Sequence, residues 1–206
     1  MAPGCSPEPS AEARAVVARH GRVLVTTALE AIARGMATKR PPSPVVPAYP
    51  EPLRRPWASF VTLHVGGDLA GCIGSAEACR PLIVDVAKNA FAAAFADIRF
   101  PPLAPRDLGD LDVEVSVLSP PTPIAFADEA DLLGRLVPGR DGLIIAAGDR
   151  RALFLPDVWR SLPEPADFLG HLKRKAGLAR DAWPEGMRAY RFSTAATSLS
   201  ELGRVA

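Results

Sequence analysis

Residues 60–74 read FVTLHVGGDLAGCIG, and this stretch decides the fold because it predicts a β-hairpin with two different faces. Val61, Leu63 and Val65 alternate with polar residues, which is the pattern of a half-buried strand. Two glycines followed by Asp68 are typical of a turn, since glycine adopts positive φ angles without strain. The stretch therefore predicts two antiparallel strands joined by a tight connection.

A three-residue loop of Gly66, Gly67 and Asp68 determines the register expected for this hairpin. In that register one face is apolar and should lie on a core, whereas the opposite face carries polar residues and a cysteine. The expected pairs are Val65–Leu69, Leu63–Gly71 and Val61–Ile73 on the apolar face, and Thr62–Cys72 and His64–Ala70 on the other.

The rest of the chain contains both helical and strand patterns. Apolar residues at helical spacing predict long helices at 11–36 and 81–96, and strict alternation predicts a strand at 111–118. Shorter patterns predict a helix at 128–136, a hairpin at 143–155, a helix at 167–175 and a last strand at 189–193. Helices combined with hairpin-linked strands favour an α+β fold with antiparallel sheets over a doubly wound fold.

Composition excludes several classes of protein. The 24 basic and 23 acidic residues give a net charge of +1, without the basic excess that a nucleic-acid-binding protein needs. No apolar stretch approaches the ~20 residues that span a bilayer. Three cysteines without a CxxC pair fit a reducing compartment and predict neither a disulfide framework nor a metal site. We expect a cytoplasmic protein without a metal or cofactor, binding neither nucleic acid nor membrane.

Cys72 is the candidate reactive residue, and two interpretations of it stay open. As a nucleophile it needs a base, and His64 lies diagonally across the hairpin, about 7–8 Å away between backbones and within reach of a long side chain. As a packed thiol it is a small hydrophobe, since free cysteine is among the most buried residue types. Glu77, just past the strand, and Glu114, on the polar face of another strand, are candidate assisting groups.

Three further residues of this region have candidate roles. Gly71 lies on the apolar face, where a strand glycine marks close approach of a neighbour. Gly74 ends the strand and lets the chain turn toward the next helix. Arg99, in the segment DIRF, is a candidate anchor for a carboxylate, and a surface ion pair of little energetic value is the alternative.

Several blocks, taken in order, resemble one family over nearly the whole chain after residue 56. The matching stretches are FVTL, LAGCIG, NAFAAAFADIRFPPL, VEVSVLSPP, GRDGLII, ALFLPDVW and FLGHLKRKAGL. Together they are similar to the AMMECR family, whose microbial members are called AmmeMemoRadiSam system protein A. The family signature Leu-Arg-Gly-Cys-Ile-Gly corresponds to residues 69–74, except that Ala70 stands at the arginine position.

The resemblance implies two α+β lobes, each with an antiparallel sheet and flanking helices, and a cleft between them. An N-terminal helix and a proline-rich linker, with seven prolines in residues 41–56, should precede the domain at 57–206. The smaller lobe should be inserted at roughly 120–180. Ala70, Gly71, Cys72, Ile73 and Gly74 should line the cleft, with Glu77, Arg99 and Glu114 nearby.

The expected function is that of an accessory module that binds a protein or a sizeable ligand in the cleft. The system name implies Memo-type and radical-SAM proteins as partners. The alternative is a thiol-dependent enzyme in which Cys72 acts with His64, Glu77 or Glu114. Because Ala70 replaces the signature arginine, anion binding on this face would need Arg54, Arg55 or Arg99 as a substitute.

Overall fold

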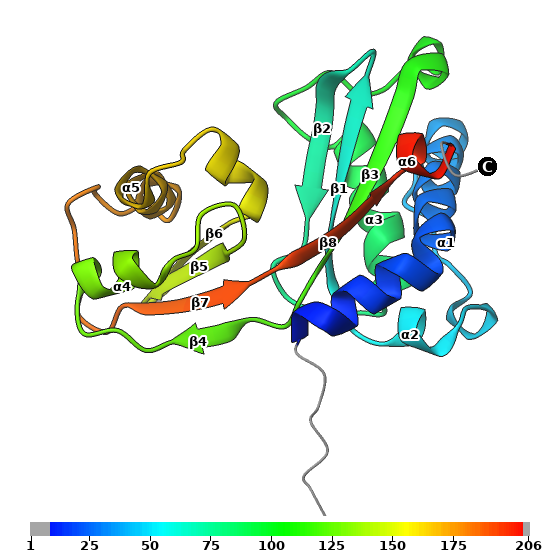
Figure 1. The fold of residues 1–206 in the computed structure, drawn as a ribbon. Coiled ribbons are helices and arrows are strands. Elements are labelled where there is room, and N and C mark those ends of the chain that lie inside the picture. The colour runs from blue at the N-terminus through cyan, green and yellow to red at the C-terminus, as the bar shows by residue number, and fades with distance from the viewer. Residues whose placement is uncertain (1–8, 204–206) are drawn as a thin grey trace, which may run out of the picture. The chain divides into compact units, whose positions relative to one another are not determined.

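Two four-stranded antiparallel sheets organise the chain, in a computed structural model that describes residues 9–203 (Figure 1). The first unit contains the chain up to Ser119 and resumes at Ala195, and the second unit is Pro120–Thr194. The α+β class with antiparallel sheets flanked by helices, expected from the sequence, is therefore confirmed.

The first unit contains the sheet with strand order β2-β1-β3-β8. Most of its elements match the expected ones within a few residues, and β8 is an additional strand that the sequence pattern did not indicate. Its helices and strands are α1 (Pro9–Thr38), α2 (Glu51–Arg54), β1 (Ala58–Val65), β2 (Asp68–Gly74), α3 (Leu82–Phe95), β3 (Leu111–Leu118), β8 (Thr194–Ser198) and α6 (Leu199–Gly203).

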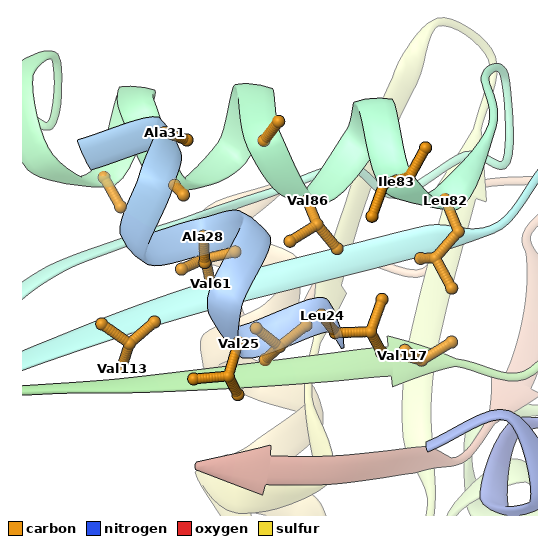
Figure 2. Close-up of a cluster of buried hydrophobic side chains, with 14 of the residues drawn as sticks. Leu24, Val25, Ala28, Ala31, Val61, Leu82, Ile83, Val86, Val113 and Val117 are labelled. Carbon is orange, nitrogen blue, oxygen red and sulfur yellow. The ribbon is translucent and has the colours of Figure 1, made fainter. Parts of the chain in front are cut away.

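Helices α1 and α3 pack on one face of this sheet (Figure 2). Leu24 and Val25 of α1 and Val86 of α3 meet Val61 and the inward valines of β3 in one apolar cluster. These side chains are at most 1% exposed. Burying a side chain of this size contributes about 1.5–3 kcal/mol, so the cluster is a main source of stability for this unit.

The β1–β2 hairpin closes with a two-residue turn instead of the expected three-residue loop. Gly66 and Gly67 have φ angles of 61° and 92°, and Val65 pairs with Asp68. The register is restored by a bulge, because His64 pairs with Leu69 and Ala70 becomes an extra residue of β2. The expected pairs Leu63–Gly71, Thr62–Cys72 and Val61–Ile73 are confirmed, whereas Val65–Leu69 and His64–Ala70 are wrong.

Gly71 is the position where β2 comes closest to α3. A Cβ atom built there would lie 2.2 Å from the carbonyl oxygen of Ala93, which is helix backbone and cannot swing aside. The close neighbour expected from the sequence is therefore a helix turn, which brings β2 directly onto α3.

The proline-rich stretch at 41–56 is more ordered than an extended surface linker. It contains a 3₁₀ helix at Val46–Ala48 and the short helix α2, and the side chain of Leu53 is fully buried. Proline is compatible with these helices because each has its proline within the first two positions. The N–H groups there make no intrahelical hydrogen bond, so none is lost.

The second unit contains the sheet with strand order β4-β7-β5-β6, two α-helices and a 3₁₀ helix at Pro156–Arg160. Trp159 stacks on Phe168 in its core, with ring centroids 3.8 Å apart, and the indole N–H donates to the Asp141 carbonyl. The short strand β4 was not expected. The elements are β4 (Thr122–Ile124), α4 (Glu129–Arg135), β5 (Gly142–Ala147), β6 (Arg150–Phe154), α5 (Pro165–Lys175) and β7 (Arg188–Phe192).

Lys173 of α5 is a fully buried cation in this second unit. Its ammonium group donates to the Glu129 carboxylate at 2.7 Å and to the Arg180 carbonyl at 3.1 Å. It also lies 5.1 Å from the centre of the Trp183 ring. A buried charge is tolerated only when it is paired in this way, so Lys173 joins α4, α5 and the chain that follows α5.

We predict that Gly71→Ala destabilises the first unit by about 1–3 kcal/mol, because β2 must move away from α3 to make room for a methyl group. Urea unfolding followed by circular dichroism measures the change. Gly109→Ala is the matched control, since a Cβ atom there meets nothing within 4 Å. Equal stabilities for the two variants would show that β2 is not tightly packed on the helix.

Candidate functional site

Cys72 lies on the face of the first sheet opposite to α1 and α3. Its neighbour in β1 is Thr62, whose neighbour in β3 is Glu114, so these three residues form one row across the sheet. All three are half-buried. We call this surface, made of Thr62, His64, Cys72 and Glu114, the Cys72 face. Glu114, placed by the sequence on the polar face of the strand at 111–118, thus shares a face with Cys72.

The backbone of Cys72 is held by the two charged residues of the DIRF segment. Its N–H donates to Asp97 Oδ2 at 3.0 Å, and its carbonyl oxygen accepts from a terminal nitrogen of Arg99 at 2.8 Å. The carboxylate and the guanidinium also bind each other, at 2.9 Å from Arg99 Nε and 2.7 Å from the terminal nitrogen. Arg99 is therefore an anchor for a carboxylate, and that carboxylate belongs to the chain itself.

The electrostatics of this pair follow from its hydrogen bonds. Bonds from the Arg99 side chain hold the pKa of Asp97 far below its usual value, although burial alone would raise it. The Asp97 bond in turn raises the pKa of Arg99, and Cys72 adds a smaller contribution of the same sign. The Asp97 side chain is 3% exposed and that of Arg99 is 56% exposed, so the carboxylate is inside and the cation reaches the surface.

The thiol of Cys72 has a hydroxyl partner. Thr62 Oγ1 lies 3.4 Å from Cys72 Sγ in a hydrogen bond. His64 pairs with Leu69, on the other side of the bulge from Cys72. Within residues 9–203, the structure shows no hydrogen bond between His64 and this thiol. The Cys–His arrangement considered from the sequence is therefore not formed by a direct contact.

The other candidate residues of the site lie in different surroundings. Glu77 accepts a weak 3.8 Å bond from the thiol of Cys79, in the segment after β2. Arg55 pairs with Glu12 of α1 at 2.8 Å. Glu114 remains on the Cys72 face and accepts a 3.3 Å bond from the Ser116 hydroxyl.

Three signature residues have packing roles. Ala70 and Ile73 are partly buried against the core cluster of the first unit. A Cβ atom at Gly74 would lie 2.1 Å from the Phe60 ring, so this glycine is needed for the aromatic contact as well as for the end of the strand. Among the arginines considered as substitutes at position 70, Arg99 is the one that binds the signature strand.

A second polar cluster lies next to the signature strand and was missed by the sequence analysis. Asp85 is fully buried, although it lies off the expected apolar stripe of α3. Its carboxylate accepts from the N–H and hydroxyl of Ser59, the hydroxyl of Ser75, Arg80 Nε and Asn89 Nδ2 at 2.6–2.9 Å. The spacing of Asp85 and Asn89, one helical turn apart, was the available signal. This cluster ties β1, α3 and the chain after β2 together.

Other kinds of site can be assessed for the residues that the structure describes. Among residues 9–203, no group of three or more His, Cys, Asp or Glu side chains is arranged to hold a metal ion. Within the same range, none of the helices is long and apolar enough to cross a membrane.

A family model described as AMMECR1 matches residues 25–197, which include both sheets and the signature strand. The chain belongs to the AMMECR1 family. The chain is 42% identical over 178 residues to a protein of Methanothermobacter thermautotrophicus, covering 84% of this chain and 90% of the relative. It is 40% identical over 156 residues to protein MJ0810 of Methanocaldococcus jannaschii, covering 72% and 76%.

A solved structure is similar to the AMMECR1 fold seen here. The crystal structure of the uncharacterized protein PH0010 from Pyrococcus horikoshii matches with a TM-score of 0.76 and 33% identity. The match covers 87% of this chain and 91% of that one. The family resemblance inferred from the sequence blocks is confirmed, and the fold is shared across most of both chains.

We predict that Asp97→Asn destabilises the protein by about 1–3 kcal/mol at pH 7, because charge-assisted bonds to Arg99 are lost. The pKa of Asp97 is lower in the folded state than its unfolded value of about 3.9, so its contribution is fully present above that pH. It is lost as the pH falls toward the folded pKa. Urea unfolding should show a smaller stability difference between the variant and the original chain at pH 3 than at pH 7, because pH 3 is below the unfolded pKa but still above the folded one, and a constant difference would contradict this origin.

We also predict that Asp85→Ala costs about 3–5 kcal/mol, because it leaves Arg80 and several buried donors without their acceptor. Thermal or urea unfolding measures the loss. Lys88→Ala is the control on the same helix, since Lys88 is exposed and its removal should change stability by less than about 0.5 kcal/mol. A stability loss well below this range for Asp85→Ala would mean that water takes over the hydrogen bonds of the missing carboxylate.

Proposed function

We propose that this AMMECR1-family chain is an accessory binding module, and that a protein or a sizeable ligand binds the Cys72 face of the first unit. The observation that carries the proposal is the way β2 is held. Both backbone groups of Cys72 are bound by Asp97 and Arg99, and its thiol is bound by Thr62. This arrangement makes a rigid contact surface and leaves the thiol beside a hydroxyl instead of a base.

The chemistry of the Cys72 face supports recognition of a polar surface with a mixed charge pattern. Glu114 provides a carboxylate, and Arg99 provides a half-exposed guanidinium at the edge strand. Such opposite charges on a preorganised sheet contribute more to the specificity for a complementary partner than to the binding affinity. Memo-type and radical-SAM proteins, the partners that the system name suggests, are the first candidates.

The alternative, a thiol-dependent enzyme using Cys72, is favoured by one observation. The Arg99 guanidinium binds the Cys72 carbonyl oxygen at 2.8 Å, which places a cation beside this cysteine. A neighbouring cation stabilises a thiolate, which is the reactive form of cysteine. In this reading Arg99 would stabilise the thiolate by its charge, and the thiol proton would pass to solvent, since a guanidinium cannot act as a base.

We predict that Glu114→Lys weakens binding of a purified Memo-type or radical-SAM protein by at least about tenfold, or ~1.4 kcal/mol, in biolayer interferometry. The reversed charge removes the complementarity that Glu114 provides on this face. Glu185→Lys is the matched control, since Glu185 is an exposed carboxylate of the second unit. Equal effects of the two variants, or no binding of either protein to the original chain, would count against this proposal.

Labelling with iodoacetamide at pH 7 separates the binding module from the thiol enzyme. The half-buried Cys72 should react more slowly than the exposed Cys79, which is the internal reference in the same molecule. Peptide mass spectrometry measures both rates. Labelling of Cys72 several times faster than Cys79 would favour the enzyme, because only an activated thiol overcomes the poorer access.

A further inference from the structure

Strand β2 lies at the edge of its sheet, since the strand order is β2-β1-β3-β8. One side of an edge strand carries N–H and C=O groups that its own sheet does not use, and these groups can pair with a strand from another molecule. Natural proteins usually protect such edges with charged side chains. Residues 69–76 read LAGCIGSA and contain no charged residue, so any charge at this edge comes from another part of the chain.

The Asp97–Arg99 pair supplies hydrogen bonds that imitate those of a neighbouring strand. An added antiparallel strand would offer a carbonyl oxygen to the N–H of Cys72 and an N–H to its carbonyl. Asp97 Oδ2 takes the place of that oxygen at 3.0 Å, and Arg99 takes the place of that donor at 2.8 Å. Both distances are those of ordinary backbone hydrogen bonds.

We propose that Asp97 and Arg99 close the β2 edge against strand addition, and that the partner they exclude is a second copy of this chain. Two copies of β2 related by a two-fold axis would pair antiparallel with Cys72 facing Cys72. In each copy, the Cys72 N–H would donate to the Cys72 carbonyl oxygen of the other copy. The free edge is therefore complementary to itself. Because the side chains of residues 69–76 are uncharged, they would not repel one another in such a pairing.

The edge of the second sheet shows a related arrangement. Strand β6 lies at an edge of the order β4-β7-β5-β6, and the carbonyl oxygen of Leu153 in this strand accepts from the ammonium of Lys175 at 3.1 Å. A cationic side chain thus occupies an edge-strand carbonyl in each unit. At β2 the protection is more complete, because a carboxylate also binds the N–H of the same residue.

The test compares the oligomeric state of the double variant Asp97→Ala/Arg99→Ala with that of Asp131→Ala/Arg135→Ala. Arg135 binds Asp131 through two nitrogens, as Arg99 binds Asp97, but this pair lies on helix α4. Arg135 meets strand β7 through its backbone carbonyl, which accepts from Arg191 and is kept in the control. Light scattering after size exclusion, at rising concentration, should move Asp97→Ala/Arg99→Ala toward twice the 21.8 kDa of one chain relative to the original protein. The control should behave as the original. An Asp97→Ala/Arg99→Ala protein with native circular dichroism and unchanged mass at every concentration would overturn the proposal.

Amide hydrogen exchange provides a second measurement, which does not depend on dimer formation. The Cys72 N–H should exchange at least about tenfold faster in a dilute Asp97→Ala variant than in the original chain, since its acceptor has been removed. Unchanged exchange at Cys72 in the folded variant would show that Asp97 does not protect the edge.

Discussion

The close packing of β2 on α3 is the contact on which the rest of the first unit depends. Because Gly71 has no side chain, the strand lies against the Ala93 carbonyl of the helix. This contact determines which face of β2 is directed at the core. Residues alternate along a strand, so Cys72 must then point away from the helices, beside Thr62 and Glu114. The position of the candidate site is thus a consequence of one missing Cβ atom.

Two buried carboxylates complete this arrangement, and each holds one part of the signature strand. Asp97 and its partner Arg99 bind the backbone in the middle of β2, whereas Asp85 binds Ser75, directly after the strand ends. A buried carboxylate is stable only when its oxygens are fully bonded, and both residues satisfy that condition with side-chain and backbone donors. The charges therefore act first as supports of the strand, and Arg99 in addition reaches the surface.

The fold could be predicted in large part from local patterns. Alternation gave β1, β3 and the pairing of Thr62 with Cys72, because period-two sequences allow few registers when one face is buried. The bulge at Ala70 could not be foreseen, since two-residue and three-residue glycine turns differ by one residue and both suit Gly66 and Gly67. The short strands β4 and β8 were missed because β4 contains a proline within three residues and β8, TAATS, has no bulky apolar residue to mark a buried face.

By itself the sequence determined the fold class, the family and the residues of the hairpin face, because these depend on periodicity and on ordered blocks of letters. The contacts that those residues make depend on tertiary packing. Asp97 and Arg99 are 25 and 27 positions from Cys72, and Asp85 is 26 from Ser59. Hydrogen bonds between such distant residues depend on how α3 returns the chain to the sheet. No local pattern records that geometry, so the partners of the cysteine appear only when helix and strand are packed together.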